Sequence, residues 1–207
     1  MGLGPADRTP AAAVWQSQLS KAIPILLIIY ETQKEVTMTP SFLLAYATNS
    51  GSTLEVAQSA AITLRECGFS VDLQPAKQVR SLSGYDAVVL GAPLYMFHWH
   101  SDAKKFLSRQ RSALAELPLA IFALGPFHNK EDELTSARES LDKELANFAW
   151  LKPVSIAVFP GKFDPAALRF PYNLIPALKN MPPSDERDWE AIRIWAKALA
   201  EEMKVKA

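Results

Sequence analysis

The sequence has 207 residues, a length that favours one folded domain over two. Hydrophobic residues make up 49% and charged residues 21%, a composition that excludes disorder over most of the chain. The 22 basic and 22 acidic side chains cancel, so no overall field attracts a nucleic acid, and any anion site has to be local.

The first 40 residues differ from the rest of the chain. A start rich in proline and alanine leads to the apolar run 22–30, which at about nine residues is too short to span a bilayer. Lys21 precedes this run, as in a signal peptide, but no small-residue cleavage site follows Ile29. We therefore expect residues 1–40 to be a disordered or extraneous extension and residues 41–207 to form the folded domain.

From Ser41 onward, short apolar runs alternate with stretches of helical periodicity. Continuous apolar runs of this length are typical of strands that are buried on both faces of a parallel sheet. The predicted strands are residues 42–47, 69–73, 87–90, 119–124 and 154–159. The predicted helices are residues 54–67, which end before Gly68, then 101–115, 131–148 and 184–204.

The alternation of strands and helices predicts an α/β fold. Right-handed crossovers between such strands give a three-layer α/β/α sandwich, with a five-stranded parallel sheet of order 2-1-3-4-5. In such a sheet, ligands bind beyond the carboxyl ends of the strands, where the strand order reverses. Three loops meet there: those after Ala47, Leu90 and Leu124.

One segment interrupts this alternation. Residues 160–183 contain six prolines together with Phe163, Phe170, Tyr172 and Leu174. We interpret the segment as an irregular, apolar insertion before the last helix. Long insertions of this kind are often functional.

The loop after the first strand carries the clearest binding pattern, Thr48-Asn49-Ser50-Gly51-Ser52-Thr53. A phosphate monoester at a helix N-terminus needs backbone N–H groups, short hydroxyl side chains, and a glycine where the chain approaches closely. The hexapeptide supplies all three, and it needs no Lys or Arg because the amides and the helix dipole accommodate the dianion. The alternative is that Ser52 or Thr53 simply caps the helix.

The pattern T-x-S-G-S-T after an apolar first strand resembles the phosphate-binding loop of the flavodoxin family, and it differs from G-x-G-x-x-G and from the P-loop. The segments that follow the third and fourth strands are similar to the loops that border the flavin ring in that family. The resemblance implies a flavodoxin-like fold and bound flavin mononucleotide (FMN). The cofactor-binding residues it implies are Thr48, Asn49, Ser50, Gly51, Ser52, Thr53, Ala92, Pro93, Leu94, Tyr95, Gly125, Pro126 and Phe127.

Aromatic side chains accompany these loops. A flavin ring needs a flat apolar slot, and Tyr95, Phe97, Trp99 and Phe127 offer aromatic faces beside two of the loops. Aromatic residues near strand ends often pack in the core instead. We expect Tyr95 to contact the ring and Trp99 to be structural.

A narrower resemblance, from Ser41 to about Met203, is to the quinone-dependent (menaquinone-dependent) protoporphyrinogen dehydrogenase branch of flavodoxin-like proteins. That branch has an insertion rich in basic and aromatic residues before the last helix. The insertion here keeps Lys162, Arg169 and Lys179 without the full basic cluster. The segments that carry the resemblance are 84–101, 167–171 and 188–190.

This resemblance implies an FMN-dependent oxidoreductase that acts on a bulky, porphyrinogen-like substrate and uses a quinone or another acceptor. The alternative is a flavodoxin-type electron carrier without its own substrate, although carriers typically have an acidic docking face and this chain is neutral. A module that has lost FMN is disfavoured by the intact loop. The expected partners are a redox protein or a quinone, with a homo-oligomer and a peripheral membrane contact through residues 160–183 as further expectations.

The histidines and the single cysteine complete the candidate groups. Cys67 is alone, so an intramolecular disulfide is excluded and the cytoplasm is the default compartment. An H-x-H pair such as His98 and His100 could hold a metal, but the Cys/His spacings of metal sites are absent from the sequence, so no metal site is predicted. Because imidazoles titrate near neutral pH, both are candidates for catalytic proton transfer. The alternative is a hydrogen-bonded surface pair at the start of a helix.

Overall fold

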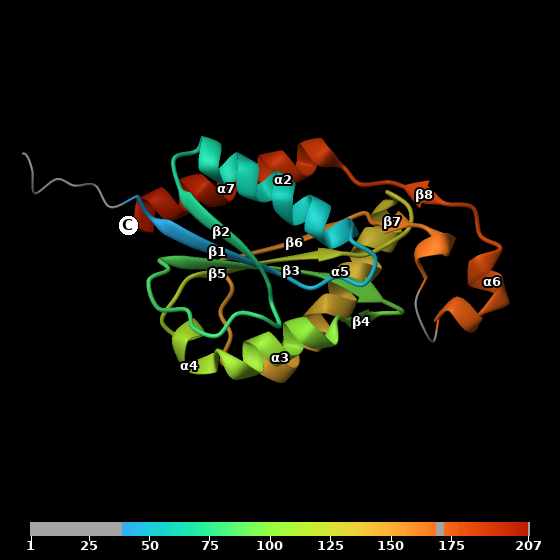
Figure 1. Cartoon of the computed structure of the whole chain (residues 1–207), viewed down its shortest axis with the longest axis horizontal. Coiled ribbons are helices and arrows are strands. Elements are labelled where there is room, and N and C mark those ends of the chain that lie inside the picture. The colour runs from blue at the N-terminus through green and yellow to red at the C-terminus, as the bar shows by residue number, and fades with distance from the viewer. Residues whose placement is uncertain (1–38, 169–171, 207) are drawn as a thin grey trace, which may run out of the picture. The chain divides into compact units, whose positions relative to one another are not determined.

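The computed structural model describes residues 39–168 and 172–206. Its main sheet has five parallel strands in the order β2-β1-β3-β5-β6, which confirms the predicted order 2-1-3-4-5 (Figure 1). A sixth strand, β4, pairs antiparallel with the end of β3. The strands are β1 (Ser41–Tyr46), β2 (Ser70–Pro75), β3 (Ala87–Tyr95), β4 (His98–Trp99), β5 (Leu119–Leu124) and β6 (Ser155–Phe159).

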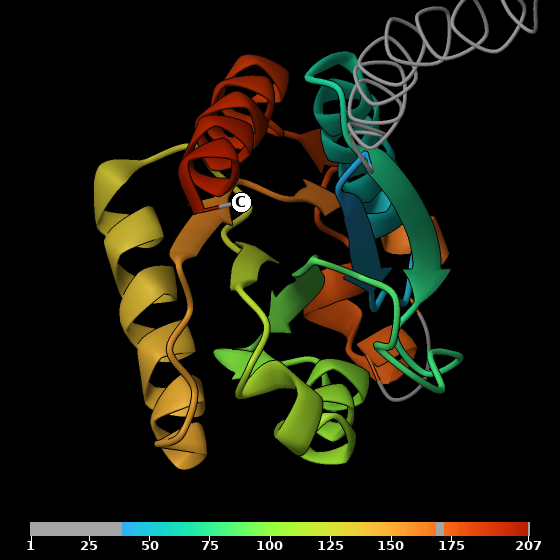
Figure 2. The same cartoon turned by 90° about the vertical axis from the view of Figure 1, so that its left-hand side faces the viewer.

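Helices cover both faces of the sheet, as the predicted three-layer sandwich requires (Figures 1 and 2). Side chains alternate along β1: Phe42 and Leu44 pack toward α2 and α7, whereas Leu43 and Ala45 pack toward α3 and α5. Each face of the sheet therefore has its own apolar core. The helices are α2 (Ser52–Glu66), α3 (Ser101–Arg109), α4 (Arg111–Leu114), α5 (Glu131–Leu145), which continues into a 3₁₀ turn at Ala146–Phe148, and α7 (Trp189–Lys206).

Helices α2 and α7 contact each other on one face of the sheet. Ala60 and Ala61 of α2 belong to the same buried cluster as Ala196 and Ala200 of α7. Small side chains allow two helices to approach closely. The first and last helices of the described domain thus share a single core.

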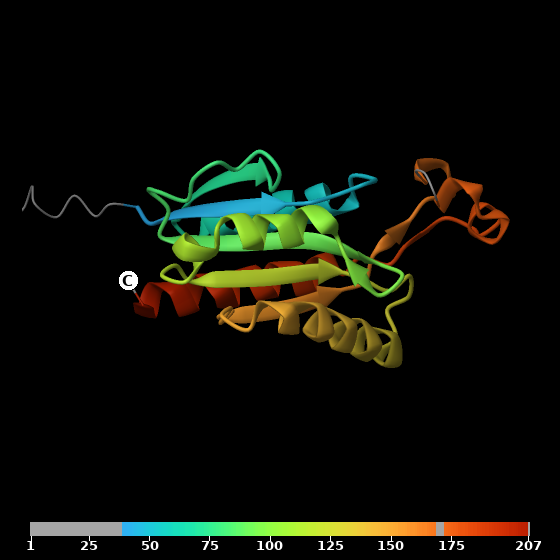
Figure 3. The same ribbon diagram turned by 90° about the horizontal axis from the view of Figure 1, so that it is seen from below.

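The segment after β6 is more ordered than predicted. It lies at the end of the molecule to which β1, β3 and β5 point (Figures 1 and 3). Its strands β7 and β8 pair antiparallel, with Lys162 opposite Asp185. Its elements are β7 (Lys162–Phe163), 3₁₀ turns at Pro165–Ala167 and Tyr172–Leu174, α6 (Pro176–Lys179) and β8 (Ser184–Asp185).

Two predicted boundaries are wrong. The last helix begins at Trp189 and not at Ser184, because Ser184 pairs with β7 and the Asp188 carboxylate accepts the N–H of Ala191 at 2.9 Å. The third strand continues five residues beyond Leu90, because residues 91–93 still pair with β5 and Leu94 and Tyr95 pair with β4. The helix predicted at 101–115 is divided into α3 and α4.

Gly91 shows why this stretch of β3 reads as a loop in the sequence. It lies opposite Phe122 of β5, and a Cβ atom on it would stand 2.0 Å from the ring carbon Cζ of Phe122. Only glycine fits at that position. The residue marks close packing inside a strand, and not the end of the strand.

Two of the predictions from the sequence fall partly on residues that the structure does not describe. The expectation for residues 1–40 falls, up to residue 38, outside the described residues, and so does the stretch 169–171 of the insertion. No helix in residues 39–168 or 172–206 combines the length and the apolar character that crossing a membrane requires.

Candidate functional site

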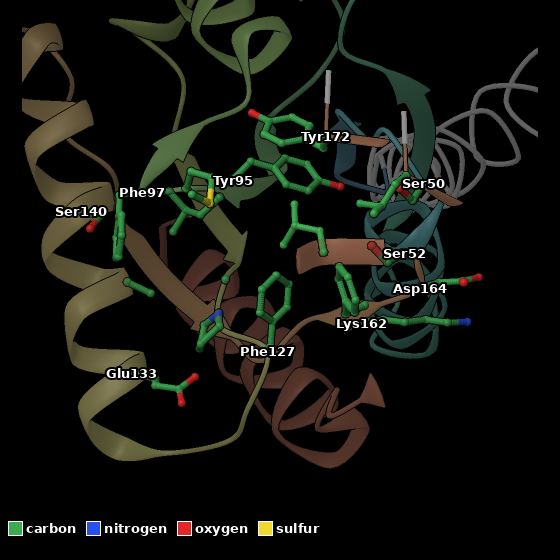
Figure 4. A pocket seen from close by; sticks show the side chains of 18 of the residues that line it. Ser50, Ser52, Tyr95, Phe97, Phe127, Glu133, Ser140, Lys162, Asp164 and Tyr172 are labelled. Atoms are coloured by element: carbon green, nitrogen blue, oxygen red, sulfur yellow. The ribbon is translucent and has the colours of Figure 1, made fainter. Parts of the chain in front are cut away.

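A cavity of about 460 Å³ lies where the loops after β1, β3 and β5 meet. This volume falls within the range of small-molecule sites. Figure 4 shows Ser50 and Ser52 on the side of α2, Phe97 and Ser140 on the side of α5, and aromatic rings between them. The predicted convergence of the three loops is therefore present. The members of the predicted set that line the cavity are Ser50, Ser52, Leu94, Tyr95, Gly125, Pro126 and Phe127.

Helix α2 begins without a side-chain cap. Its N-cap is Gly51, with φ at 92°, and no side chain accepts a hydrogen bond from the first turn. The left-handed φ explains the glycine. The interpretation that Ser52 or Thr53 merely caps the helix is therefore wrong. The first N–H groups of a helix have no partner within the helix, so they are available to an anion.

The hydroxyl of Thr53 gives a second indication of an anion. Thr53 is fully buried, and its Oγ1 has no hydrogen-bond partner within the described residues. A buried polar atom without a partner costs about 1–3 kcal/mol, so proteins rarely retain one without a reason. A phosphate at the start of α2 would accept from this hydroxyl and from the free amides. The residues present thus fit the phosphate of FMN.

The other residues of the loop hold its shape. Thr48 Oγ1 accepts the N–H of Gly51 at 2.9 Å, and Asn49 Oδ1 accepts a hydrogen bond from a ring nitrogen of His100. Ser50 Oγ donates to the backbone oxygen of Ala167 at 3.3 Å. The loop is therefore tied to itself, to the start of α3, and to the insertion. Direct contacts of Thr48 and Asn49 with FMN remain predictions.

The insertion supplies two of the five aromatic residues that line the cavity, Phe163 and Tyr172. Tyr95 stacks on Tyr172, with ring centres 5.8 Å apart and planes at 22°. Phe127 meets Phe163 edge-on, with ring centres 4.9 Å apart. The tyrosine pair lies beside the cavity in Figure 4. Trp99 is buried and donates its Nε1–H to the Ala92 backbone oxygen at 3.3 Å, so it is structural, as expected.

Two of the residues predicted to contact the flavin ring do not line the cavity. Ala92 and Pro93 lie within β3, opposite Ala123 and Leu124 of β5, and they do not line the cavity. Their contribution to FMN binding remains a prediction.

Sequence reasoning missed one wall of the cavity. Ser136 and Ser140 of α5 stand four residues apart on one helix face, a spacing that the sequence already displays. The insertion contributes most of the other missed residues, and its sequence signals are its length, its prolines and its aromatic residues. The missed residues are Met96, Asp132, Glu133, Ser136, Ala137, Ser140, Lys162, Phe163, Asp164, Ala167, Leu168, Tyr172 and Leu178.

His98 and His100 engage different partners. The half-buried His100 accepts the N–H of Asp102 at Nδ1, so its Nε2 carries the proton and donates to Asn49 at 2.9 Å. Burial lowers the pKa of His100, although the Asp102 charge acts in the opposite direction. His98 is exposed, and its Nδ1 lies 3.0 Å from Glu144 Oε1 of α5. Each ring therefore joins two segments of the fold, and a catalytic role for either remains a prediction.

The doubly wound sheet, the uncapped helix at the first crossover and the aromatic slot define an α/β protein that binds a phosphate-bearing cofactor. The family model described as "Flavodoxin domain" matches residues 43–175, and the chain belongs to this family. FMN is therefore its cofactor. When bound, FMN supplies the electron-transfer chemistry, while the protein holds the phosphate, positions the ring and controls access.

Known proteins agree with this assignment. The chain is 29% identical over 132 residues to Protoporphyrinogen IX dehydrogenase (quinone) of Escherichia coli K12. The aligned stretch covers 62% of this chain and 70% of that protein. Oxidised Flavodoxin 2 from Bacillus cereus is similar with a TM-score of 0.52 at 20% identity, over 78% of this chain and 99% of that chain. Rubredoxin oxygen:oxidoreductase from Desulfovibrio gigas has a TM-score of 0.50 at 17% identity, over 82% and 38% of the two chains. The solved structures confirm the flavodoxin-like fold.

Proposed function

We propose that the protein is an FMN-dependent oxidoreductase that removes hydrogen from a bulky, porphyrinogen-like substrate and delivers the electrons to a quinone or another acceptor. The main support is that the cavity continues past the three flavin loops. Phe163, Leu168, Tyr172 and Leu178 of the insertion add an apolar wall to it. An enzyme needs such a wall to hold a substrate against the flavin, whereas a carrier has no substrate to hold.

The relative from Escherichia coli also supports the proposal of an oxidoreductase. Its printed name describes a quinone-linked dehydrogenase of protoporphyrinogen IX, and the similarity extends over most of its length. For the present chain, the substrate and the acceptor are part of the proposal.

The test is turnover by the full chain loaded with FMN. Under anaerobic conditions, protoporphyrinogen IX should be converted to the fluorescent porphyrin when menadione is supplied, and not when it is omitted. Tyr172→Ala should slow this reaction with little change in FMN affinity, because Tyr172 reaches the cavity from the insertion. Tyr85→Phe is the matched control, because the hydroxyl of Tyr85 bonds to Asp72 outside the cavity lining.

The second candidate is an electron-transfer protein without its own substrate. The observation that favours it is the match to 99% of the length of a flavodoxin. Absence of turnover with protoporphyrinogen, combined with electron transfer from the dithionite-reduced protein to an acceptor protein, would support the carrier and contradict the enzyme.

We also propose a peripheral membrane contact through residues 160–183, which would give access to a quinone dissolved in lipid. Leu174 and Ile175 are exposed there, as are Met96 and Phe97 of the β3–β4 turn. The FMN-loaded chain should float with lipid vesicles, and Leu174→Ser/Ile175→Ser should not. Light scattering of the FMN-loaded chain without vesicles tests the expected homo-oligomer.

A further inference from the structure

A cluster of charged side chains ties the end of the insertion to the first turn of α2. Arg187 follows β8, and its side chain is only 3% exposed. Its Nε and Nη2 bind the two oxygens of Asp185 at 2.7 and 2.6 Å, and its Nη1 binds Glu55 Oε2 at 2.7 Å. The guanidinium carbon also lies 4.5 Å from the ring centre of Trp189. A buried charge is tolerated only when it is paired in this way, so the guanidinium is held in a fixed place.

Glu55 connects this cluster to the cofactor site. It stands four residues after Gly51 and donates its N–H to the Gly51 backbone oxygen at 3.2 Å. Side chains in a helix tilt toward its N-terminus, and residues four apart share a face. The Glu55 carboxylate therefore lies on the same side of α2 as the glycine that begins it. Without a partner, that carboxylate would repel a phosphate dianion bound at the start of the helix.

The charges of the cluster balance. Lys162 stands opposite Asp185 in the β7–β8 ladder, so two cations face two carboxylates. Arg187, and more weakly Lys162, lower the pKa of Asp185, which keeps this carboxyl charged. Since Asp185 has both cations beside it, Arg187 is left to neutralise Glu55.

We propose that Arg187 is a positioning residue that makes the loop selective for the phosphorylated flavin, FMN, over riboflavin. It does so by neutralising Glu55, the carboxylate one turn from the phosphate site. This inference rests on the assignment of residues 48–53 as the phosphate loop and adds a determinant of selectivity to it. A purely structural Arg187 would support both flavins equally, whereas an electrostatic role affects only the flavin that carries a phosphate.

The experiment compares FMN with riboflavin, which lacks the phosphate, by fluorescence titration of the flavin-free full chain at low salt. Arg187→Met keeps an unbranched apolar stem and removes the charged guanidinium. It should raise the Kd for FMN about tenfold and change the Kd for riboflavin by less than about twofold. Adding Glu55→Gln to this variant should restore the Kd for FMN to within about threefold of the unmodified protein.

A second variant guards against misfolding, because removing a buried guanidinium can prevent folding altogether. Glu55→Gln alone changes an exposed side chain and leaves Arg187 paired with Asp185. The uncompensated positive charge should then lower the Kd for FMN about threefold and leave riboflavin binding unchanged. Glu66→Gln at the far end of the same helix is the matched control, and it should change neither Kd.

Equal weakening of both flavins by Arg187→Met would overturn the proposal, and so would an unchanged Kd for FMN in Glu55→Gln. If the unmodified chain bound FMN and riboflavin equally, the phosphate-loop assignment itself would fail and the role of Arg187 with it. That result is visible before any substitution is made, so the two failures can be told apart.

Discussion

The imidazole of His100 joins helix α3 to Asn49 of the loop at residues 48–53, with Nε2 2.9 Å from the side-chain oxygen of Asn49. The other ring nitrogen caps α3 by accepting the N–H of Asp102 at 3.1 Å. One side chain thus stabilises a helix and restrains the loop proposed to hold the FMN phosphate. The two roles can be separated by substitution.

His100→Asn should retain a helix cap and lose the contact with the loop, because asparagine is a good N-cap but too short to reach Asn49. We expect the Kd for FMN to rise about fivefold, as for loss of one hydrogen bond, with little change in the free energy of unfolding. His98→Ala is the control, because His98 contacts Glu144 and not the loop. Flavin titration and urea unfolding check both values, and an unchanged Kd in His100→Asn would show that the contact does not support binding.

The stability of the flavin-free protein should fall as the pH drops below about 6.5. Burial lowers the pKa of His100, against the opposing effect of Asp102. Above the ordinary imidazole pKa the ring is neutral in both states. As the pH falls, the unfolded chain binds the proton first, so the folded state loses stability. Urea unfolding between about pH 7.5 and about pH 5 should show a smaller loss in His100→Asn than in the unmodified chain, and equal losses would contradict the assignment.

Thr53→Val should increase stability while weakening cofactor binding. The substitution removes a buried hydroxyl that has no partner in the described residues, which should stabilise the flavin-free protein by about 1 kcal/mol. The same change removes a donor to the phosphate, so the Kd for FMN should rise about tenfold. Thr63→Val is the matched control in the same helix, because the Thr63 hydroxyl donates to Ser59. It should lose stability and keep its FMN affinity, and a stable Thr53→Val with normal affinity would refute the phosphate site.

The turn between β3 and β4 should be more stable with a standard turn sequence. Met96 and Phe97 both have positive φ, at 47° and 67°, a conformation that is unfavourable for bulky side chains. Met96→Asn/Phe97→Gly should raise the free energy of unfolding by about 1–2 kcal/mol. Met96→Ser/Phe97→Ser removes the exposed apolar side chains but keeps the strain of a positive φ, and it should give no gain, which separates backbone relief from loss of exposed apolar surface. A gain of the same size in both variants would count against strain.

Gly91→Ala should destabilise the domain by about 2–3 kcal/mol, because the new Cβ atom meets the Phe122 ring. That ring cannot move freely, since it packs against Phe159 and Trp195. In a Phe122→Leu background, Gly91→Ala should cost less free energy of unfolding than it does in the unmodified chain, because the smaller leucine leaves room for the new Cβ atom. Thermal unfolding measures all three variants, and additive losses would show that the contact is not the cause.

The sequence predicts the sheet well because its signals are local. Apolar runs that end at glycine or at small polar residues mark each buried strand, and the order of the strands follows from the handedness of the crossovers. The loop at residues 48–53 is also a local signal, because its hydroxyls and its glycine stand directly between a buried strand and a helix start.

Contacts that depend on distant segments could not be predicted. Tyr172 is one of three aromatic residues in the aperiodic stretch 160–183, and its stacking on Tyr95 exists only after the insertion folds against the ends of the strands. Pro93 and Gly91 resemble loop residues, yet both lie in a strand because β5 pairs with them. Ser184 and Asp185 could have begun the last helix, and it is their partner β7 that makes them a strand.

The packing of α7 against α2 has a consequence for biosynthesis. Helix α2, which follows the loop at residues 48–53, is buried against α7, which is synthesised much later, so a growing chain has no complete core behind the loop until α7 is made. Cofactor uptake should therefore wait until α7 has been synthesised, and shortening the chain within α7 should abolish retention of the flavin even though the loops that line the cavity are intact.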